Sequence, residues 1–309
     1  MKSNIHIPVL LKESIDLLDV QSNGIYVDCT SGRGGHSSAI LNRLSSKGKL
    51  ICIDTDKEAV AFLDQKFSQN KNVTVLKGNF KDIASLLASL NIYVVDGLIA
   101  DLGVSSPMFD DPIRGFSYHD DAKLDMRMDQ TQELDAEYII NKYSEEQLIA
   151  IFKDYGEVNI PNNVVKNIIK ERSTHRISST KELLDIIKKS LSWKDLSKDK
   201  HPAKVYFQAL RIEVNHELDN LKELLNNQIP NLLKKNGRAV VISFHSLEDR
   251  IVKDSFIELT SNKTPKEIPI LTKPNFSLLT RKPIIASEEE LNYNNRSHSA
   301  KLRGVIKNV

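Results

Sequence analysis

The chain has 309 residues, about two domains' worth, and its 40% hydrophobic and 27% charged residues exclude a disordered chain or a fibrous repeat. The formal net charge of +2 indicates no partner by itself, and the two cysteines, Cys29 and Cys52, fit neither a disulfide framework nor a metal site. Because the chain has no apolar run long enough to cross a bilayer and Met1–Pro8 is not a secretory signal, we expect a soluble, cytoplasmic protein without membrane contact.

The first hundred residues alternate between strand and helix patterns. The segments between the strands carry apolar residues at helical spacing, as over residues 83–90. Parallel neighbours need a crossover, so the alternation predicts an α/β fold with a mostly parallel, doubly wound sheet. Buried strands are predicted at residues 24–29, 49–53, 73–76 and 94–100.

A glycine-rich turn, Gly32 to His36, follows the first strand and precedes a predicted helix. Glycines let a ligand approach the backbone and expose amides at a helix start, although a tight turn with a capped helix explains them equally. Asp54 ends the second strand nineteen residues after Gly35, the spacing at which an acid reaches ribose hydroxyls. Asp28, before the turn, suits a cationic amine. The pattern favours S-adenosylmethionine over a dinucleotide, with Phe80 packing near its adenine.

The alternation stops after Asp101, which ends the fourth strand. Residues 102–129 have no period, and their aromatic and proline content indicates a functional loop. The pattern is then helical from about residue 134 to 191. We expect residues 106–200 to form a loop plus an all-helical insertion for substrate recognition, and residues 1–105 and 201–309 to form the sheet domain. A long helix from His201 to Lys234 would precede a strand at Arg238–Ser243.

Charge is segregated along the chain. Residues 101–160 carry a net charge of −9 and residues 166–211 one of +7, while residues 296–307 add four bases and no acid. A solvated helical surface explains one basic helix. A basic block facing a cleft is also what a phosphate backbone requires, so both interpretations stay open.

Several longer motifs resemble the RsmH/MraW family of bacterial 16S ribosomal RNA (cytosine(1402)-N(4))-methyltransferases. The resemblance runs from His6 to the last predicted strand. The motifs are TSGRGGH (Thr30 to His36), DLGVSSP (Asp101 to Pro107), RGFS (Arg114 to Ser117), LDMRMD (Leu124 to Asp129), HPA (His201 to Ala203), FQALRIEVN (Phe207 to Asn215), ISFHSLEDRIVK (Ile242 to Lys253) and RSHSAKLR (Arg296 to Arg303).

The resemblance implies a Rossmann-like, class I S-adenosylmethionine-dependent methyltransferase with an inserted helical domain and 16S rRNA of the small ribosomal subunit as partner. The oligomeric state is open, with a homodimer among the options. Relatives often carry glutamine where this chain has Met108 and proline where it has Lys123. Cofactor contacts are implied for Gly34, Gly35, His36, Asp54, Phe80, Asp101 and the position of Met108.

The implied nucleophile is the exocyclic N4 of cytosine, which needs positioning and a nearby carboxylate rather than a metal. Asp101 is the candidate catalytic residue; the alternative is that it only binds the cofactor. The target base must leave its stack, and aromatic or arginine side chains in the irregular loop can receive it or pack as the loop's own core. These side chains are Phe109, Arg114, Phe116, Tyr118 and Arg127.

The motif after the strand at Arg238–Ser243 contains both His245 and Ser246. We interpret Ser246 as a helix cap paired with Asp249, because no nucleophile elbow surrounds it, and His245 as a substrate contact. For Arg211, Glu213 and Asn215, packing and RNA contact are both open.

Three other functions remain open from the sequence. A methyltransferase can act on another amine, in DNA or protein. An NAD-dependent oxidoreductase would bind NADH instead of S-adenosylmethionine. An RNA-binding assembly factor with a vestigial pocket would bind RNA without methylating it.

Overall fold

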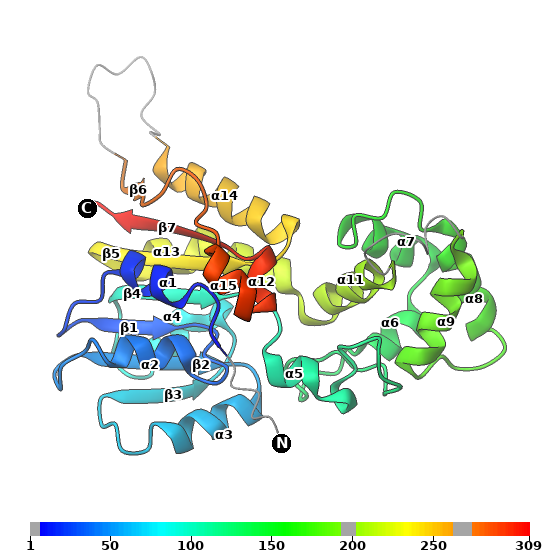
Figure 1. Ribbon diagram of the computed structural model, residues 1–309, viewed down its shortest axis with the longest axis horizontal. Coiled ribbons are helices and arrows are strands. Elements are labelled where there is room, and N and C mark those ends of the chain that lie inside the picture. The colour runs from blue at the N-terminus through cyan, green and yellow to red at the C-terminus, as the bar shows by residue number, and fades with distance from the viewer. Residues whose placement is uncertain (1–6, 193–201, 262–273) are drawn as a thin grey trace, which may run out of the picture. The chain divides into compact units, whose positions relative to one another are not determined.

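The computed structural model describes residues 7–192, 202–261 and 274–309. By contact, the chain divides into a sheet unit, which comprises the residues up to Gly103 and those from Leu218 onward, and a helical unit, Val104–Glu217 (Figure 1). His201 and the basic-block lysines Lys194, Lys198 and Lys200 lie outside the described residues.

The sheet has strand order β3-β2-β1-β4-β5-β7-β6. Neighbours from β3 to β5 pair in parallel, whereas β7 runs antiparallel to both β5 and β6. This topology confirms the expected Rossmann-like, mostly parallel sheet. The strands are β1 (Ile25–Asp28), β2 (Lys49–Asp54), β3 (Val73–Lys77), β4 (Val95–Asp101), β5 (Leu233–Ser243), β6 (Phe276–Leu278) and β7 (Lys301–Lys307).

Helices and short helical turns connect these strands. They are α1 (Leu11–Leu18), α2 (Gly35–Leu41), α3 (Lys57–Lys66), the 3₁₀ turn η1 (Phe80–Asp82), α4 (Ile83–Ala88), α12 (Glu217–Glu223), the π-helical turn η3 (Leu224–Gln228), α13 (Ile229–Leu232), α14 (Ser246–Thr260), α15 (Glu288–Tyr293) and the 3₁₀ turn η4 (Asn295–Ser299).

Both faces of the sheet are buried, because successive strand residues point to opposite sides. Val27 and Ile51 pack in a core with α4, α12, α13 and α14. Tyr26 and Leu50 pack in a second core with α1, α2 and α3. Burial on both faces explains why the strands are continuous apolar runs rather than alternating ones. This arrangement places the carboxyl ends of β1, β2 and β4, where polar residues begin, on the same side of the sheet.

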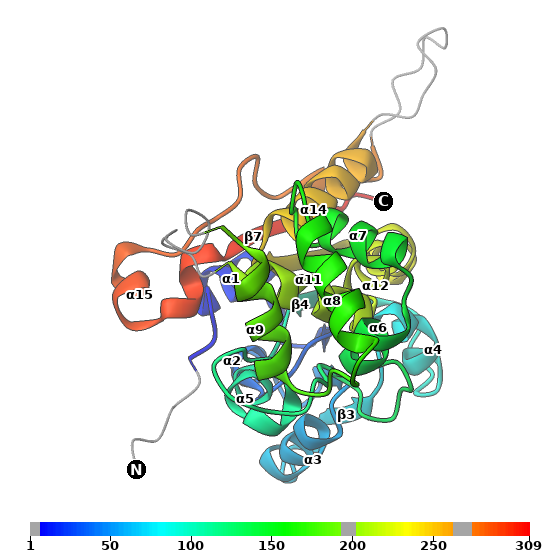
Figure 2. The ribbon, with the colours of Figure 1, turned by 90° about the vertical axis from the view of Figure 1, so that its right-hand side faces the viewer.

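The helical unit has its own apolar core. Figure 2 shows the helices of this unit. Four of its α-helices begin at side chains that accept a hydrogen bond from the first turn, Ser105, Asp135, Ser144 and Ser179. The elements are α5 (Ser106–Asp110), the 3₁₀ turn η2 (Pro112–Arg114), α6 (Ala136–Lys142), α7 (Glu145–Asp154), α8 (Asn162–Arg172), α9 (Thr180–Ser190) and α11 (Ala203–Asn215).

The second domain boundary differs from the expected one at residues 200/201. Helix α11 packs within the helical unit rather than the sheet unit, because its apolar face, with Tyr206, Phe207 and Leu210, is buried in the helical core. The long helix expected from about His201 to Lys234 is confirmed in part, since residues 203–232 are helical as α11, α12, η3 and α13. It is interrupted at His216, whose φ of 50° lies in the left-handed region.

Strand β5 starts earlier than expected. It begins at Leu233 rather than at Arg238, so Asn236 and Gly237 lie inside it. Asn236 has a φ of 65°, and the pairing with β4 changes register between Val95 and Gly97. Asn236 and Gly237 therefore form an irregularity inside the strand.

Candidate functional site

Three aspartates end neighbouring parallel strands: Asp28 on β1, Asp54 on β2 and Asp101 on β4. The carboxyl ends of strands are where open α/β sheets bind ligands. Asp28 and Asp54 are 2% and 9% exposed, and the pKa of Asp28 rises through burial first and then through the charge of Asp54. The sheet therefore brings three carboxyl groups together at the carboxyl ends of its parallel strands.

The turn after β1 is fixed by hydrogen bonds to these strand ends. Ser37 Oγ donates to Asp28 Oδ2 at 2.6 Å, and the amide of Thr30 donates to Asp28 Oδ1 at 3.3 Å. Thr30 Oγ1 in turn accepts from the amide of Asp101 at 2.7 Å. Burial raises the pKa of Asp28 to about 6 even though Ser37 and Thr30 oppose the shift. Thr30, the first residue of the motif Thr30 to His36, therefore connects Asp28 to Asp101, and no signal in the sequence indicated this role.

Asp54 holds the other side of the same turn. Its Oδ2 accepts from the amide of Gly32 at 2.8 Å, and its Oδ1 accepts from the amide of Asp56 at 2.9 Å. Burial raises the pKa of Asp54 to about 6, against these two hydrogen bonds. Each carboxylate oxygen keeps capacity for a further donor, as a ribose hydroxyl would provide.

Asp101 faces His36 across this edge. His36 Nδ1 lies 3.9 Å from Asp101 Oδ2, and its Nε2 lies 3.2 Å from the carbonyl oxygen of Val9. Burial, followed by the charges of Asp28 and Glu248, raises the pKa of Asp101 well above its ordinary range. Asp101 Oδ1 is buried and has no hydrogen-bond partner among the described residues. A buried acceptor in this state suits a ligand that brings a hydrogen-bond donor or a positive charge.

Gly34 and Gly35 serve packing within the turn. A Cβ on Gly34 would lie 2.9 Å from Leu63 Cδ2, and its φ of 69° disfavours other residues. A Cβ on Gly35 would lie 2.1 Å from Pro8 Cγ. The amide of Gly34 donates to the Ser31 carbonyl at 2.6 Å. The space at the Cβ positions of these glycines is thus filled by the protein's own side chains, and contact of their backbone with a cofactor stays a prediction.

The last two expected cofactor residues lie in different units. Phe80 opens η1, directly beyond β3, and packs partly buried against the apolar core of the sheet unit. Met108 belongs to the helical unit, where it is 4% exposed and packs in the helical core. Within the sheet unit, the structure brings Asp28, Asp54, Asp101, His36 and the glycine turn together, and the cofactor contact expected at Met108 of the helical unit stays a prediction.

Most of the candidate base-contacting residues serve the helical unit's own packing. Phe116 is buried in its core, and the buried Arg114 donates to the carbonyls of Arg127 and Met128. Arg127 forms a two-point ion pair with Asp125, at 2.8 and 2.7 Å. These contacts fold the irregular loop upon itself.

The two remaining aromatic candidates differ in exposure. Tyr118 packs edge-on against Phe207, with ring centroids 5.6 Å apart. Phe109 is 41% exposed. Of the expected base-stacking residues, Phe109 is therefore the one whose surface is available in this unit.

The open residues of α11 are also engaged within the helical unit. Arg211 pairs with Glu217 at 2.8 and 3.0 Å, and Glu213 accepts from Tyr143 Oη at 2.9 Å. Asn215 Nδ2 donates to the Met126 carbonyl, while its Oδ1 accepts from the amide of Met128. These contacts favour packing over RNA contact.

The cap of α14 is one residue earlier than expected. His245 is the N-cap, and its Nδ1 accepts from the amide of Glu248, 3.4 Å away. Glu248 Oε2 accepts from the amides of Phe244 and His245, at 2.8 and 3.3 Å. The Ser246–Asp249 cap is therefore wrong, because the chain enters the helix at Ser246 itself. Asp249 instead accepts from Lys301 and Arg303 on β7.

The donor set fits S-adenosylmethionine. That molecule carries a sulfonium, an ammonium and two ribose hydroxyls, all of which a cluster of buried carboxyl groups can bind. The unpartnered Asp101 Oδ1 and the raised pKa values of Asp28 and Asp54 are the observations that agree with such a ligand. We see no comparable match to the pyrophosphate of a dinucleotide, since the amides of Gly32 and Gly34 are used inside the turn.

The chain is similar over its whole length to curated bacterial proteins named ribosomal RNA small subunit methyltransferase H. The relative from Ureaplasma parvum is 54% identical, with all of both chains covered. The Malacoplasma penetrans relative is 49% identical over all of this chain and 98% of its own, and a Clostridium botulinum relative is 47% identical over 96% and 97%. A crystal structure of an rRNA methylase from Streptococcus thermophilus covers 98% of this chain at 12% identity and a TM-score of 0.41, a likeness too low to add to the topology above.

Two further findings complete the comparison. Within residues 7–192, 202–261 and 274–309, no helix is both long and apolar enough for a membrane span. The model of the MraW methylase family matches residues 3–308. The expected resemblance is thereby confirmed, and the chain belongs to the MraW methylase family, with a class I, S-adenosylmethionine-dependent methyltransferase fold.

Proposed function

We propose that this protein transfers a methyl group from S-adenosylmethionine to the exocyclic N4 of a cytosine, position 1402, in 16S rRNA of the small ribosomal subunit. One observation carries the proposal: relatives named as small-subunit rRNA methyltransferases match this chain from end to end at up to 54% identity. The choice of cytosine N4 rests on the motifs that resemble the RsmH/MraW family, above all Asp101 to Pro107 after β4.

Asp28 and Asp54 would bind the methyl donor. When bound, S-adenosylmethionine supplies an electrophilic methyl carbon on a positively charged sulfur. Asp54 would accept hydrogen bonds from ribose hydroxyls, and Asp28 would offer its carboxylate to the ammonium. Because both groups are anchored by the turn, they arrive oriented and the reaction does not need to order them.

Asp101 would act on the attacking amine. Its amide is anchored on Thr30 Oγ1, which fixes the carboxyl group at the end of β4. A positive charge nearby favours its ionised form and releases the proton that burial retains. The ionised Oδ1 can then accept a hydrogen bond from the N4 amine and stabilise the positive charge that develops during attack.

The two roles open for Asp101 predict different kinetics. If Asp101 acts on the amine, Asp101→Asn lowers kcat with donor affinity nearly retained. If it only binds the donor, the same substitution raises the donor's Kd and leaves the saturated rate close to wild type.

The helical unit would recognise the RNA substrate. On α8 and α9, the exposed bases Lys166, Lys170, Lys181, Lys188 and Lys189 give this unit a cationic surface. Such bases suit a phosphate backbone, and their contribution should diminish as salt rises. Neutralising Lys188 and Lys189 should weaken subunit binding and flatten its salt dependence, whereas an unchanged salt slope would leave them as surface charges only.

Mapping of modified cytosines tests the proposed function. Small-subunit RNA from cells with the protein should carry a methyl group on N4 at one cytosine, and RNA from cells without it should not. In vitro, labelled donor should be incorporated into small subunits or their rRNA but not into DNA or peptide. Methylation of a different amine would refute the substrate, and binding of NADH in place of the donor would refute the enzyme class.

A further inference from the structure

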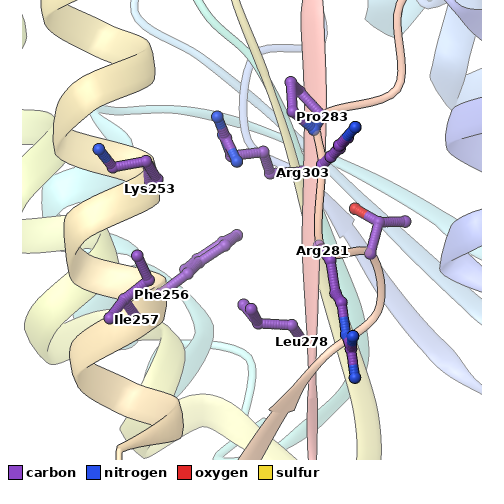
Figure 3. Close-up of a pocket in the computed structure, with 10 residues that line it drawn as sticks. Lys253, Phe256, Ile257, Leu278, Arg281, Pro283 and Arg303 are labelled. Atoms are coloured by element: carbon purple, nitrogen blue, oxygen red, sulfur yellow. The ribbon is translucent and has the colours of Figure 1, made fainter.

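A cavity lies in the sheet unit, and none of the three aspartates lines it. It has a volume of about 200 Å³ and is enclosed by α14, the segment that follows β6, and β7 (Figure 3). Lys253, Phe256 and Ile257 approach it from the helix, and Arg303 approaches from β7. Neither the methyl-transfer chemistry nor the helical unit uses this cavity.

The cavity is lined by basic residues and by no acidic residue. Arg303 Nε donates to Asp249 Oδ1 at 2.7 Å, and Lys253 Nζ lies 3.3 Å from Asp254 Oδ1. Arg281 and Lys282 are exposed, and neither forms an ion pair with any residue in the described ranges. The lining thus has two cations that no carboxylate of the described residues neutralises, which suits an anion.

The same cavity offers a polar atom and an apolar wall. Thr280 Oγ1 is buried without a hydrogen-bond partner among the residues that the structure describes. A buried hydroxyl without a hydrogen-bond partner is unusual, and a ligand that accepts a hydrogen bond from it would stabilise it. Ile257 and Leu278 are 50% and 37% exposed at the cavity wall, an apolar surface on which a sugar or base can pack.

We propose that this cavity binds a nucleotide of a single-stranded rRNA segment outside the methylation site. The phosphate would lie between Arg281 and Lys282, with Thr280 Oγ1 donating to a phosphate oxygen. The attached sugar or base would pack on Leu278 and Ile257. Cations that follow the backbone beside surfaces that accept bases are what single-strand binding sites combine. The inference rests on the proposed function, since it needs rRNA as the partner.

The double variant Arg281→Ala/Lys282→Ala tests the site without removing a described ion pair. Affinity for a labelled single-stranded oligouridylate and for small subunits is measured at several salt concentrations. Losing the one phosphate held between these two cations should reduce the salt slope by about 0.7 and the affinity by roughly fivefold near 0.1 M salt. Thr280→Val, which removes the hydroxyl at constant shape, should weaken binding by about tenfold.

Lys47→Ala/Lys49→Ala is the matched control, since it removes two exposed positive charges at the start of β2. It should change neither affinity nor slope. Equal losses in both double variants would reduce the effect to overall charge and overturn the site, and so would wild-type affinity in Arg281→Ala/Lys282→Ala. Inorganic phosphate that competes as well as the oligouridylate, at equal phosphate concentration, would indicate a free-anion site and overturn the RNA assignment.

Methyl transfer distinguishes this inference from the proposed function. If the inference holds, Arg281→Ala/Lys282→Ala raises KM for small subunits, while kcat at saturation and donor affinity stay at wild-type values. If wild-type protein methylates subunits and the variant matches it in KM, the cavity is not an RNA site. If wild-type protein methylates no rRNA, the proposed function itself fails.

Discussion

The affinity for S-adenosylmethionine should depend on pH near 6. Burial raises the pKa of Asp28 and of Asp54 to about 6 in the protein without donor. Both carboxyl groups are therefore largely protonated at pH 5 and largely ionised at pH 7. A cationic donor stabilises the ionised forms, so binding must release protons at the lower pH.

The size of the effect follows from the two pKa values. At pH 5, one unit below a pKa of about 6, only about a tenth of each carboxyl group is ionised. If the donor binds only the ionised form of one group, its apparent affinity at pH 5 is about tenfold lower than at neutral pH. If both Asp28 and Asp54 must ionise, the reduction relative to neutral pH is roughly 100-fold. The affinity should rise as pH increases through 6 and then level off, before the donor's own amino group begins to titrate near pH ~8.

Isothermal titration calorimetry between pH ~5 and ~7, in buffers of different ionisation enthalpy, measures both affinity and released protons. Asp54→Asn should bind more weakly and show a shallower profile, because one of the two protons is gone. A flat profile for wild-type protein, or an affinity that rises as pH falls, would refute the assignment of these carboxyl groups to the donor.

Three other outcomes follow from the structure. Without donor, the raised folded-state pKa values of Asp28 and Asp54 contribute stability that is complete below pH ~4, and about 3 kcal/mol for each group is lost as pH rises through 6; urea denaturation at several pH values should show this contribution to the free energy of unfolding falling over that range. Gly35→Ala places a methyl group 2.1 Å from Pro8 Cγ and should cost about 1–3 kcal/mol of stability by thermal denaturation, unless the segment with Pro8 moves without penalty. Asn215→Ala leaves buried backbone groups unpaired and should cost about 1–3 kcal/mol; denaturation at wild-type denaturant concentrations would contradict that role.

The positions of the first four strands were predictable from the sequence, because a parallel sheet that is buried on both faces requires continuous apolar runs. Leu50 and Ile51 are neighbours on β2 and face different cores, so both of them had to be apolar. The boundary between the helical unit and the sheet unit after α11 was not predictable in the same way. The apolar stripe of α11, with Tyr206 and Phe207, shows that one face is buried but not which unit buries it.

The site was predictable at the level of residue type and less so at the level of contact. Asp54 was placed by its spacing from the glycine turn, and the structure ties the two through the amide of Gly32. Met108, chosen by resemblance, is buried in the other unit's core. The cap of α14 was missed because histidine rarely serves as an N-cap, so the serine beside His245 was the stronger local signal.

The position of β7 has a consequence for how the protein is made. Residues 301–307 lie between β5 and β6; they pair with β6 and with the edge of β5 that faces away from β4. During synthesis the parallel half of the sheet can assemble early, whereas β5 presents an unpaired edge until the segment 301–307 has left the ribosome. A nascent chain stalled before that point would expose an aggregation-prone strand, so truncations that remove β7 should accumulate as insoluble protein even though every aspartate of the site is present.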